Sequence, residues 1–429
     1  MKKVALHNLG CKVNAYELEA MQQLLMENGY EIVPFSERAD IYIVNTCTVT
    51  NMADRKSRQM LHRAKKNNPD AVIVAAGCYV QEKGVQADDC IDIIVGNNKK
   101  KDILTILGEY EKDRRDGVLD ARIDIGHARE YEELTLSCTA EHTRAYIKVQ
   151  DGCNQFCSYC IIPYARGRER SLAASEVVSI AKDLENKGHL EIVLTGIHTG
   201  RYNDGDHDLC DLLEMLLRNT SPKIAFRLSS IEITEISDRF IELMKKEPRI
   251  LHHLHIPVQS ACNATLKRMN RPYTIEQFKE RIEQLRQEIP DISVSTDIIA
   301  GFKQESDEEF EETLRNVQDI RFSFMHVFPF SIRKGTAAEQ MPGTVHGTIA
   351  KQRVDTLLDL SAWFRQADME RFSQGDVLIE KEENGQWHGY TNQYHPIVIE
   401  SSEPLSGRVH VRFDRIEDGH YIGRTVKED

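Results

Sequence analysis

The feature that most constrains the fold is a long succession of strand–helix units between residues 144 and 370. Short runs rich in β-branched and aromatic residues alternate there with amphipathic stretches of helical period, such as Ala174–Lys187 and Leu209–Asn219. Six units in succession predict a partial or complete parallel barrel of the (βα)6 type, with function at the carboxyl ends of its strands. The six predicted strands are Ala145–Val149, Ile192–Thr195, Phe226–Ser229, Leu254–Val258, Ser293–Ile299 and Phe324–Phe328.

Two further regions flank this barrel, so the predicted fold class is α/β with a small β-domain at the end. Residues 1–108 alternate short strands with helical stretches, the pattern of a parallel α/β domain. Residues 371–429 contain short strands punctuated by glycines, which predicts a small β-barrel. Before the barrel region at 144–370, residues 109–143 carry ten acidic and five basic side chains with weak periodicity, and we interpret them as an exposed linker or a hairpin-like crossing.

The composition limits the cellular compartment of the protein and the chemistry that its cysteines can perform. The chain has ten cysteines in 429 residues, too few for a disulfide scaffold, and a formal net charge of -13 that gives no overall attraction to nucleic acid. Its N-terminus reads as a short strand, and no apolar run approaches the roughly 18 residues that a membrane span needs. We therefore expect a cytoplasmic protein without a membrane partner, whose cysteines are metal ligands or free thiols.

The sharpest local signal is a group of three cysteines directly after the first predicted barrel strand: Cys153, Cys157 and Cys160, here named the loop cysteines. Soft thiolates select zinc, copper(I) or iron–sulfur clusters. Zinc normally takes a fourth ligand nearby, and neither cysteine nor histidine follows within twenty-five residues. Three ligands on one compact loop suit a 4Fe–4S cluster with one iron open to a substrate or cofactor. A zinc site completed from a distance and simple buried thiols are the alternatives.

Three other cysteines are far apart in sequence but occupy equivalent positions. Cys11, Cys47 and Cys78, here named the sheet-edge cysteines, each follow one predicted strand of the N-terminal region. Parallel strands present such turns at one edge of the sheet, where ligands of open α/β sheets gather. This placement predicts a second metal cluster, with unpaired buried thiols as the alternative. The other four cysteines are interpreted as structural: Cys90, Cys138, Cys210 and Cys262.

The loop cysteines after a first barrel strand resemble those of the radical S-adenosylmethionine (SAM) superfamily. Together with the sheet-edge cysteines and the terminal β-domain, they resemble the methylthiotransferases over essentially the whole chain. The terminal segment is similar to a TRAM domain, an RNA-binding β-barrel. Lys12-Val13 after Cys11 and Thr48-Val49-Thr50 after Cys47 resemble the branch that acts on threonylcarbamoyladenosine in tRNA. The branches that modify isopentenyladenosine in tRNA and an aspartate of a ribosomal protein are the alternatives within this enzyme class.

The resemblance implies SAM and two 4Fe–4S clusters as cofactors. A cluster on the loop cysteines would cleave SAM to a 5′-deoxyadenosyl radical, which removes hydrogen from C2 of the adenine at position 37. A cluster on the sheet-edge cysteines would present sulfur, and a second SAM would provide the methyl group. Two clusters would be needed because sulfur must be held near the carbon radical before another donor quenches it. The implied product is the 2-methylthio derivative of N6-threonylcarbamoyladenosine.

The ends of the barrel strands supply the SAM contacts that the resemblance implies. Tyr159 would lie against the adenine of SAM, and Thr195-Gly196 would contact the methionine amino group. Each candidate is alternatively a solvated loop residue, and Arg268 alternatively pairs on its helix. The family usually has Pro-Gly where this chain has Lys303-Gln304, so we expect a looser turn there. Four further candidates for ribose or carboxylate contacts are Glu232, Gln259, Arg268 and Asp297.

An acidic protein can still bind RNA through a local basic face, because phosphate contacts supply sequence-independent affinity. The twelve residues from Arg55 to Lys66 contain six basic and no acidic side chains, with a solvated helix face as the alternative reading. The partners implied by the resemblance are the anticodon stem-loop of tRNA and an electron donor such as flavodoxin or ferredoxin. We expect a monomer. The predicted RNA contacts are Arg55, Lys56, Arg58, Arg166, Arg168 and Arg412.

Two functions from other classes fit the same six cysteines: a two-cluster electron carrier and an RNA-binding scaffold. Neither would cleave SAM. Reconstitution with SAM and dithionite therefore distinguishes them from the enzyme, because only the enzyme yields 5′-deoxyadenosine.

Overall fold

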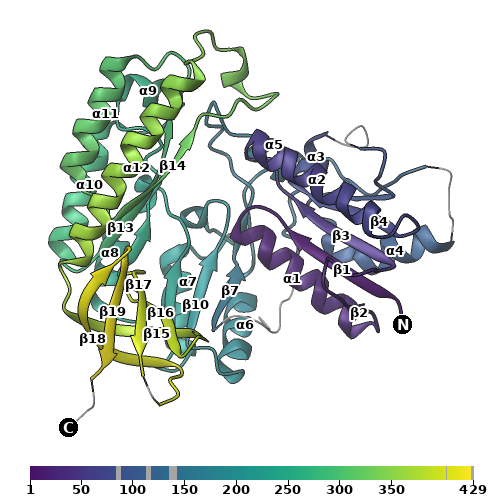
Figure 1. The fold of residues 1–429 in the computed structure, drawn as a ribbon, viewed down its shortest axis with the longest axis horizontal. Helices are drawn as coiled ribbons and strands as arrows, with labels where there is room; N and C mark the ends of the chain where they lie inside the picture. Colours follow the sequence, from purple (N-terminus) through teal and green to yellow (C-terminus); the bar gives the residue numbers. More distant parts are fainter. Residues whose placement is uncertain (84–87, 113–116, 135–142, 402, 427–429) are drawn as a thin grey trace.

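The computed structural model describes all residues except 84–87, 113–116, 135–142, 402 and 427–429. Its first part is a parallel sheet flanked by helices (Figure 1). The elements of this part are β1 (Lys3–Asn8), α1 (Lys12–Glu27), β2 (Glu31–Ile32), β3 (Ile41–Thr46), α2 (Asn51–Asn67), β4 (Val72–Gly77), α3 (Cys78–Lys83), β5 (Ile93–Val95), α4 (Ile103–Lys112) and β6 (Leu119–Asp120).

The N-terminal sheet is covered on both faces. Its strand order is β2-β1-β3-β4-β5-β6, and every neighbouring pair is parallel. Leu61 of α2 packs with Tyr42 on one face, whereas Met21 of α1 and Ile103 of α4 pack with Ile41 on the other. Strands buried on both faces read as continuous apolar runs, which is why the sequence already indicated this parallel α/β structure. The prediction is confirmed.

The central region contains the six predicted parallel strands, in chain order. They form two three-stranded sheets, β7-β10-β11 and β12-β13-β14. Backbone hydrogen bonds join the two sheets: Leu251 N donates to Phe226 O (2.9 Å), and Ile231 N donates to His255 O (3.0 Å). The strands are β7 (Arg144–Lys148), β10 (Glu191–Thr195), β11 (Ala225–Leu228), β12 (His253–His255), β13 (Ser293–Ala300) and β14 (Phe324–Pro329).

Helices follow these strands and enclose one large apolar core, whose members include Phe226, Phe278 and Phe322. A short antiparallel pair of strands, β8 and β9, stands beside the start of the barrel. The connecting elements are β8 (Gln150–Asp151), α5 (Ile162–Arg166), β9 (Arg170–Ser171), α6 (Ala174–Asn186), α7 (Leu209–Asn219), α8 (Asp238–Lys246), α9 (Asn263–Arg268), α10 (Ile275–Glu288), α11 (Asp307–Ile320) and α12 (Gly347–Met369).

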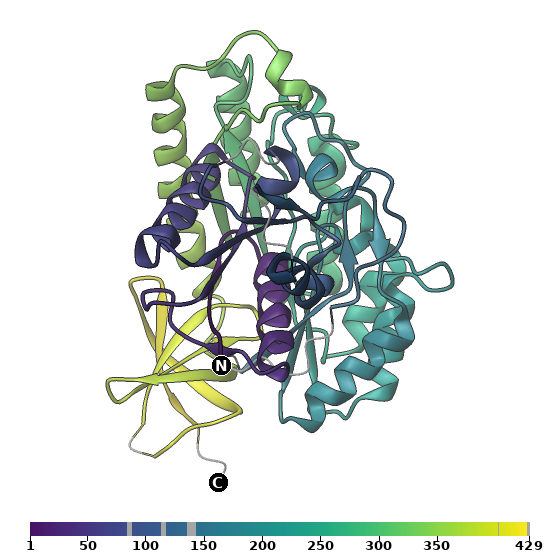
Figure 2. The same cartoon turned by 90° about the vertical axis from the view of Figure 1, so that its right-hand side faces the viewer.

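The C-terminal strands close into a separate barrel in the order β15-β16-β17-β19-β18. Its small core includes Val377, Ile399 and Tyr421. Figures 1 and 2 show this barrel (yellow) next to the N-terminal region (purple) and the central strands (teal). The five strands are β15 (Gln374–Glu383), β16 (Gln386–Thr391), β17 (Pro396–Glu400), β18 (Arg408–Glu417) and β19 (His420–Thr425).

The described part of 109–143 departs from an exposed linker at both of its ends. Helix α4 continues through Lys112, and β6 adds a strand to the N-terminal sheet. Leu134 is buried and its carbonyl accepts a hydrogen bond from Tyr16 Oη (2.8 Å), while Glu132 is 1% exposed and accepts one from Lys101 N (2.9 Å). On the other side, Tyr131 Oη donates to Lys148 O of β7, so residues 131–134 pack between the N-terminal region and the barrel, a tertiary contact that periodicity cannot reveal.

Candidate metal centres

The loop cysteines lie between β8 and α5, directly after the first barrel strand. Gly152 opens this loop with φ +77°, and a Cβ there would lie 2.0 Å from Arg168 O, so only glycine fits. Cys153 N donates to Gly167 O (3.1 Å), and Cys160 N donates to Cys157 O (2.9 Å). These bonds hold the three cysteines on one compact loop.

Cationic side chains contact two of the loop thiols. His198 Nδ1 lies 3.5 Å from Cys153 Sγ, and Arg271 Nη1 donates to Cys157 Sγ (3.4 Å). Burial raises the pKa of Cys160 to about 12, and the neighbouring Cys157 adds to the rise. Desolvated thiols that raise one another's pKa become thiolates only beside a strongly cationic partner. An iron–sulfur cluster fits this donor set, because thiolates are its usual ligands.

The sheet-edge cysteines come together because β1, β3 and β4 are adjacent parallel strands. Cys11 precedes α1, Cys47 follows β3 and Cys78 begins α3. A Cβ at Gly10 would lie 2.8 Å from Cys47 Sγ, so the first turn approaches the second as closely as glycine permits. Burial raises the pKa of Cys47 to about 11, with Cys78 and Cys11 adding to the rise. This second set of three thiols has the same chemistry as the first.

A buried charge network connects the two cysteine sets. Glu17 of α1 accepts hydrogen bonds from Arg166 Nη1 (2.8 Å), Lys100 Nζ (2.5 Å) and Lys148 Nζ (3.0 Å). Asp151 accepts from Arg166 (3.0 Å) and Lys148 (3.3 Å), and none of the five residues is more than 2% exposed. Although burial opposes ionisation, these cations hold the pKa of Glu17 well below its usual range and lower that of Asp151 to about 2. The network fixes α1 against the barrel.

Two uncharged side chains, those of Asn97 and Asn14, add hydrogen bonds between the N-terminal region and α5. Asn97 Nδ2 donates to Cys78 Sγ (3.5 Å) and to Ala165 O (2.7 Å). Asn14 Oδ1 accepts from Arg166 Nη2 (2.6 Å). Asn97 therefore joins the turn after β5, and Asn14 joins the first turn of α1, to α5, the helix that follows the loop cysteines. Asparagine is common near turns for local reasons, so the sequence offers no signal for this role.

A third link starts from the segment after β14. Arg333 is 2% exposed, and its Nη2 donates to Thr48 Oγ1 (2.7 Å) and Asp54 Oδ2 (2.7 Å). Its Nη1 donates to Asn51 Oδ1 (2.8 Å). This guanidinium fastens the last barrel strand to the turn that carries Cys47. It too was absent from the predicted site residues, because its partners are nearly three hundred positions away.

The predicted SAM contacts occupy several kinds of position: Tyr159 lies in the loop between β8 and α5, Arg268 ends α9 and Asp297 lies within β13. Thr195 is buried at the end of β10, and Gly196 follows it. Tyr159 is half-buried, with its ring edge-on to Phe302 at 6.4 Å. Glu232 accepts a hydrogen bond from Arg271, which also contacts Cys157.

Of the other three predicted contacts, Asp297 and Arg268 have side-chain partners within the protein. Gln259 adopts φ +65°, a conformation that favours glycine. Asp297 Oδ1 lies 3.4 Å from His255 Nε2. Arg268 Nη1 donates to Glu309 of α11 (2.8 Å), and its Nη2 donates to Thr265 Oγ1 of its own helix α9 (3.1 Å).

The expectation of a loose turn at Lys303-Gln304 is wrong. Gly301 N donates to Glu305 Oε2 (2.7 Å), which closes the turn. Gln304 adopts φ +62° and its N donates to Gly343 O (2.7 Å). The glutamine takes the left-handed conformation that glycine would take with less strain, so the turn stays tight without the family's usual residues.

Five of the six predicted RNA contacts are exposed, and one is not. Arg168 is exposed, and its guanidinium lies 4.7 Å from the ring centre of Phe156. Arg166 is fully buried in the charge network, so the prediction that it contacts RNA is wrong. Its main carboxylate partner, Glu17, is 149 positions away, which a local count of basic residues cannot show. The exposed members on α2 and β18 are Arg55, Lys56, Arg58 and Arg412.

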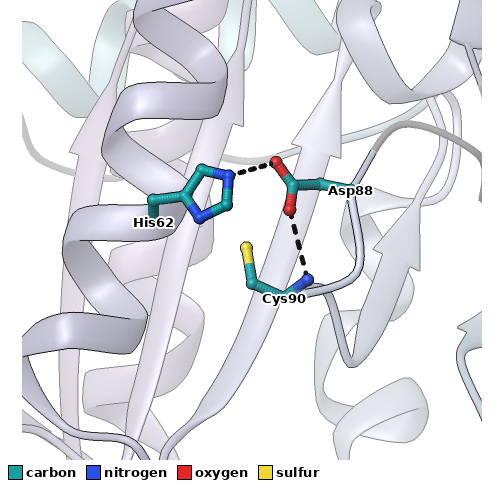
Figure 3. Close-up of side chains that lie close together, drawn as sticks. All are labelled: His62, Asp88 and Cys90. Carbon is teal, nitrogen blue, oxygen red and sulfur yellow. Dashed lines mark hydrogen bonds and ion pairs between the residues drawn. The ribbon is translucent and has the colours of Figure 1, made fainter.

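Two groups of metal-type donors lie outside both cysteine sets in the described ranges. His62, Asp88 and Cys90 place donor atoms within 4.8 Å of one another (Figure 3). His62 Nε2 lies 2.8 Å from Asp88 Oδ2, and Asp88 Oδ1 accepts from Cys90 N (3.2 Å). These partners already satisfy the carboxylate, and we interpret the group as a link between α2 and the turn before β5. The second group is on adjacent barrel strands: His255, Asp297 and His326.

The remaining cysteines of the described ranges form no further set of three thiols. Cys210 and Cys262 are buried and Cys90 is half-buried, whereas Cys138 lies outside the described residues. Across the described ranges, the helices are too short or too polar to cross a membrane.

Comparisons with known proteins agree with this geometry. Residues 147–317 match the radical SAM superfamily, and residues 3–96 match a family described as uncharacterized protein family UPF0004. The radical SAM methyltransferase TsrM of Kitasatospora setae has a similar fold, with a TM-score of 0.56 at 16% identity over 76% of this chain and 73% of that one. The cobalamin-dependent radical SAM enzyme OxsB has a similar fold with a TM-score of 0.52, at 12% identity over 85% of this chain and 56% of that one. Fold and loop cysteines define a radical SAM protein.

Curated relatives extend over nearly the whole chain. The threonylcarbamoyladenosine tRNA methylthiotransferase MtaB of Bacillus subtilis is 41% identical over 420 residues, 95% of this chain and 93% of the relative. That of Aquifex aeolicus is 37% identical, over 86% of this chain and 90% of the relative. A tRNA-2-methylthio-N6-dimethylallyladenosine synthase of Moorella thermoacetica is 31% identical over 97% of each. The chain belongs to the radical SAM methylthiotransferases, in their threonylcarbamoyladenosine tRNA branch.

This membership confirms the predicted resemblance and the class of enzyme, a transferase of sulfur-containing groups. The family uses SAM and two 4Fe–4S clusters, and the two sets of three thiols fit that requirement.

Proposed function

We propose that this chain converts N6-threonylcarbamoyladenosine in tRNA to its 2-methylthio derivative. One observation carries the proposal: two sets of three thiols are fastened to each other through the buried Glu17 network, in a chain 41% identical to a methylthiotransferase of this specificity. Replacement of an unactivated hydrogen by sulfur requires that the radical and the sulfur donor be held close together. A fixed distance between two metal centres provides this.

The loop cysteines would hold the cluster that binds SAM, and the sheet-edge cysteines would hold the second cluster. When bound, these groups supply the reductive cleavage of SAM, the inserted sulfur and the methyl group. The chain itself contributes the positions of these groups and the exclusion of water from between them. Arg271 holds a cationic donor at Cys157, and the five charged residues of the network are at most 2% exposed, so water is excluded between the sites.

The SAM site is proposed at the strand ends nearest the loop cysteines. Thr195-Gly196 would meet the methionine amino group, and Tyr159 the adenine. Glu232, Gln259 and Asp297 are proposed for polar contacts to SAM. Arg268 is set aside, because its guanidinium already pairs with Glu309.

The anticodon stem-loop is proposed to lie against the exposed basic face of α2, which begins four residues after Cys47. Arg168 and Arg412 would extend this face, and the closed C-terminal barrel would act as a TRAM-like RNA-binding domain. We further propose that the protein is a cytoplasmic monomer and that a flavodoxin or ferredoxin supplies its electrons. The proposed domain division is residues 1–108, 109–143, 144–370 and 371–429. Strand β6 of the N-terminal sheet ends at Asp120, so the first of these boundaries lies beyond that residue.

A nucleoside digest of tRNA tests the proposed function. A strain that lacks this chain and any second enzyme of the same specificity should accumulate N6-threonylcarbamoyladenosine and lose its 2-methylthio derivative. The wild-type chain should restore the derivative, and Cys157→Ala should not. Loss of the methylthio isopentenyl nucleoside instead would assign the chain to that branch. Absence of 5′-deoxyadenosine from the purified chain with SAM and dithionite would favour an electron carrier.

A further inference from the structure

Lys12 is a charged side chain that the proposed chemistry leaves unused. It directly follows Cys11 and begins α1. Its side chain is exposed, and among the described residues it has neither a carboxylate within ion-pair distance nor a hydrogen-bond partner. Its ammonium nitrogen lies 5.7 Å from the ring centre of Tyr394, in the turn between β16 and β17 of the C-terminal barrel. Lys12 is also one of the residues in which the sequence resembles the threonylcarbamoyladenosine branch.

Three cationic side chains lie within cation–π distance of the Tyr394 ring. Besides Lys12, the guanidinium carbons of Arg227 and Arg144 lie 4.9 Å and 5.1 Å from its centre. The two arginines are neutralised, because Arg227 Nε donates to Glu191 (2.7 Å) and Arg144 Nε donates to Glu380 (2.7 Å). Lys12 is thus the one cation of the three that forms no ion pair with a carboxylate of the described chain.

The ring that gathers these cations is held rigidly. Tyr394 adopts φ +70°, a left-handed conformation that is strained for a tyrosine. It stacks on Tyr390 at 4.8 Å and on His253 at 5.1 Å. Residues from α1, from the barrel strands and from the C-terminal barrel therefore meet at one preorganised cationic face beside Cys11.

We propose that Lys12 binds the carboxylate of the threonylcarbamoyl group and thereby selects the substrate; this assignment rests on the proposed function. An adenine whose C2 faces the sheet-edge cysteines carries its N6 substituent on the other side of N1. A group that recognises that substituent must therefore lie beside the sulfur-delivering turn, where Lys12 lies. An unpaired ammonium on a flexible stem forms a charge-assisted hydrogen bond with a carboxylate. An isopentenyl group is apolar and offers no such partner, so the same lysine discriminates against it.

Binding to chemically matched RNAs tests this role. The probes are anticodon stem-loops that carry N6-threonylcarbamoyladenosine, its methyl ester or plain adenosine, with the reconstituted anaerobic enzyme. The wild type should bind the free acid about 10- to 100-fold more tightly than the ester, the range of one charge-assisted bond. Lys12→Met should remove this preference, while Lys12→Arg should keep most of it. Lys187→Met replaces an exposed lysine at the end of α6 and should change nothing.

The outcomes separate the possible roles. An unchanged ratio of acid to ester in Lys12→Met overturns the assignment. An equal loss of affinity for all three stem-loops also overturns it, because it identifies Lys12 as a phosphate contact. Iron content, measured on every variant, excludes damage to the neighbouring cluster site as the cause. If the wild type forms no 2-methylthio product from the free acid, the proposed function itself fails, and a binding preference without product would leave only the Lys12 contact standing.

Discussion

Glu17 and Arg166 form a two-pronged ion pair in the interior of the protein, with Nη1–Oε1 at 2.8 Å and Nη2–Oε2 at 3.1 Å. Neither side chain is more than 1% exposed. Glu17 belongs to α1, which begins directly after Cys11, and Arg166 ends α5, which begins two residues after Cys160. One buried pair therefore sets the position of one cysteine set against the other.

Glu17→Gln should destabilise the protein strongly, because three buried cations would lose their main counter-charge. Breaking a buried ion pair from one side costs about 3–5 kcal/mol. Anaerobic denaturant unfolding followed by circular dichroism measures the loss. Glu27→Gln, an exposed change on the same helix, is the control and should be near neutral. Equal stability of Glu17→Gln and the wild type would mean that the network does not hold the two regions together.

The two cysteine sets should separate SAM cleavage from sulfur insertion. Cys47→Ala should still form 5′-deoxyadenosine from SAM and dithionite but should make no methylthio nucleoside. Cys157→Ala should form neither. Each variant should bind about four fewer iron atoms than the wild type, one cluster of the 4Fe–4S type. If Cys47→Ala inserted sulfur at the normal rate, the sheet-edge cysteines would have another role.

Gln304→Gly should stabilise the turn between β13 and α11. Gln304 is held at φ +62°, and a non-glycine residue in this region is strained by about 1–2 kcal/mol, part of which glycine returns through its greater freedom in the unfolded chain. We expect a net gain of up to about 1 kcal/mol in unfolding free energy. Gln304→Ala retains a Cβ and should show no such gain. A loss of stability in Gln304→Gly would mean that the glutamine side chain makes the more important contribution.

Stability should fall in acid through Asp368, which docks α12 against the C-terminal barrel. Its Oδ2 lies 2.9 Å from His395 Nε2 and accepts from Ser293 Oγ (2.6 Å). Burial opposes ionisation, but these partners lower the pKa of Asp368 to about 2 from 3.8. A carboxyl whose pKa is lowered on folding stabilises the fold at any pH above its ordinary pKa. It loses that effect as the pH falls toward its pKa in the folded protein.

The contribution of Asp368 is therefore full above about pH 4, is lost between about pH 4 and pH 2, and is on the order of 2 kcal/mol. Asp368→Asn should be less stable than the wild type at pH 6, and the difference should shrink below pH 4 in thermal unfolding scans. Asp418→Asn, an exposed change in the same barrel, should follow the wild-type curve. A difference that is independent of pH would exclude the carboxylate as the cause.

The exposed face of α2 should contribute to RNA affinity through its charge. Replacing Arg55 and Lys56 by Gln should weaken anticodon stem-loop binding and lower the slope of log K against log salt by about 0.7 to 0.9 per residue. Arg218→Gln removes an exposed arginine on α7 that already pairs with Glu214 and is the matched control. Unchanged slopes for the α2 variants would place the RNA elsewhere.

Both cysteine sets could be predicted because their signals are local or strictly periodic. The loop cysteines lie within eight residues of one another, and each sheet-edge cysteine follows its own strand, so parallel pairing of neighbouring strands is enough to bring the second set together. The six barrel strands were predictable for the same reason, since buried parallel strands are continuous apolar runs.

The roles of the charged residues, unlike those of the cysteines, could not be predicted from the sequence. Arg166 looked like a surface contact, and Glu17 and Lys148 drew no attention, because Glu17 is more than one hundred positions away from both Arg166 and Lys148. Likewise, nothing around Lys12 in the sequence reveals that two neutralised arginines and a strained tyrosine surround it. The sequence by itself determined the order of the elements and the supply of thiols. Only the tertiary structure decided which charges are buried together and which one stays unpaired, because burial and pairing depend on distances between segments that local periodicity does not encode.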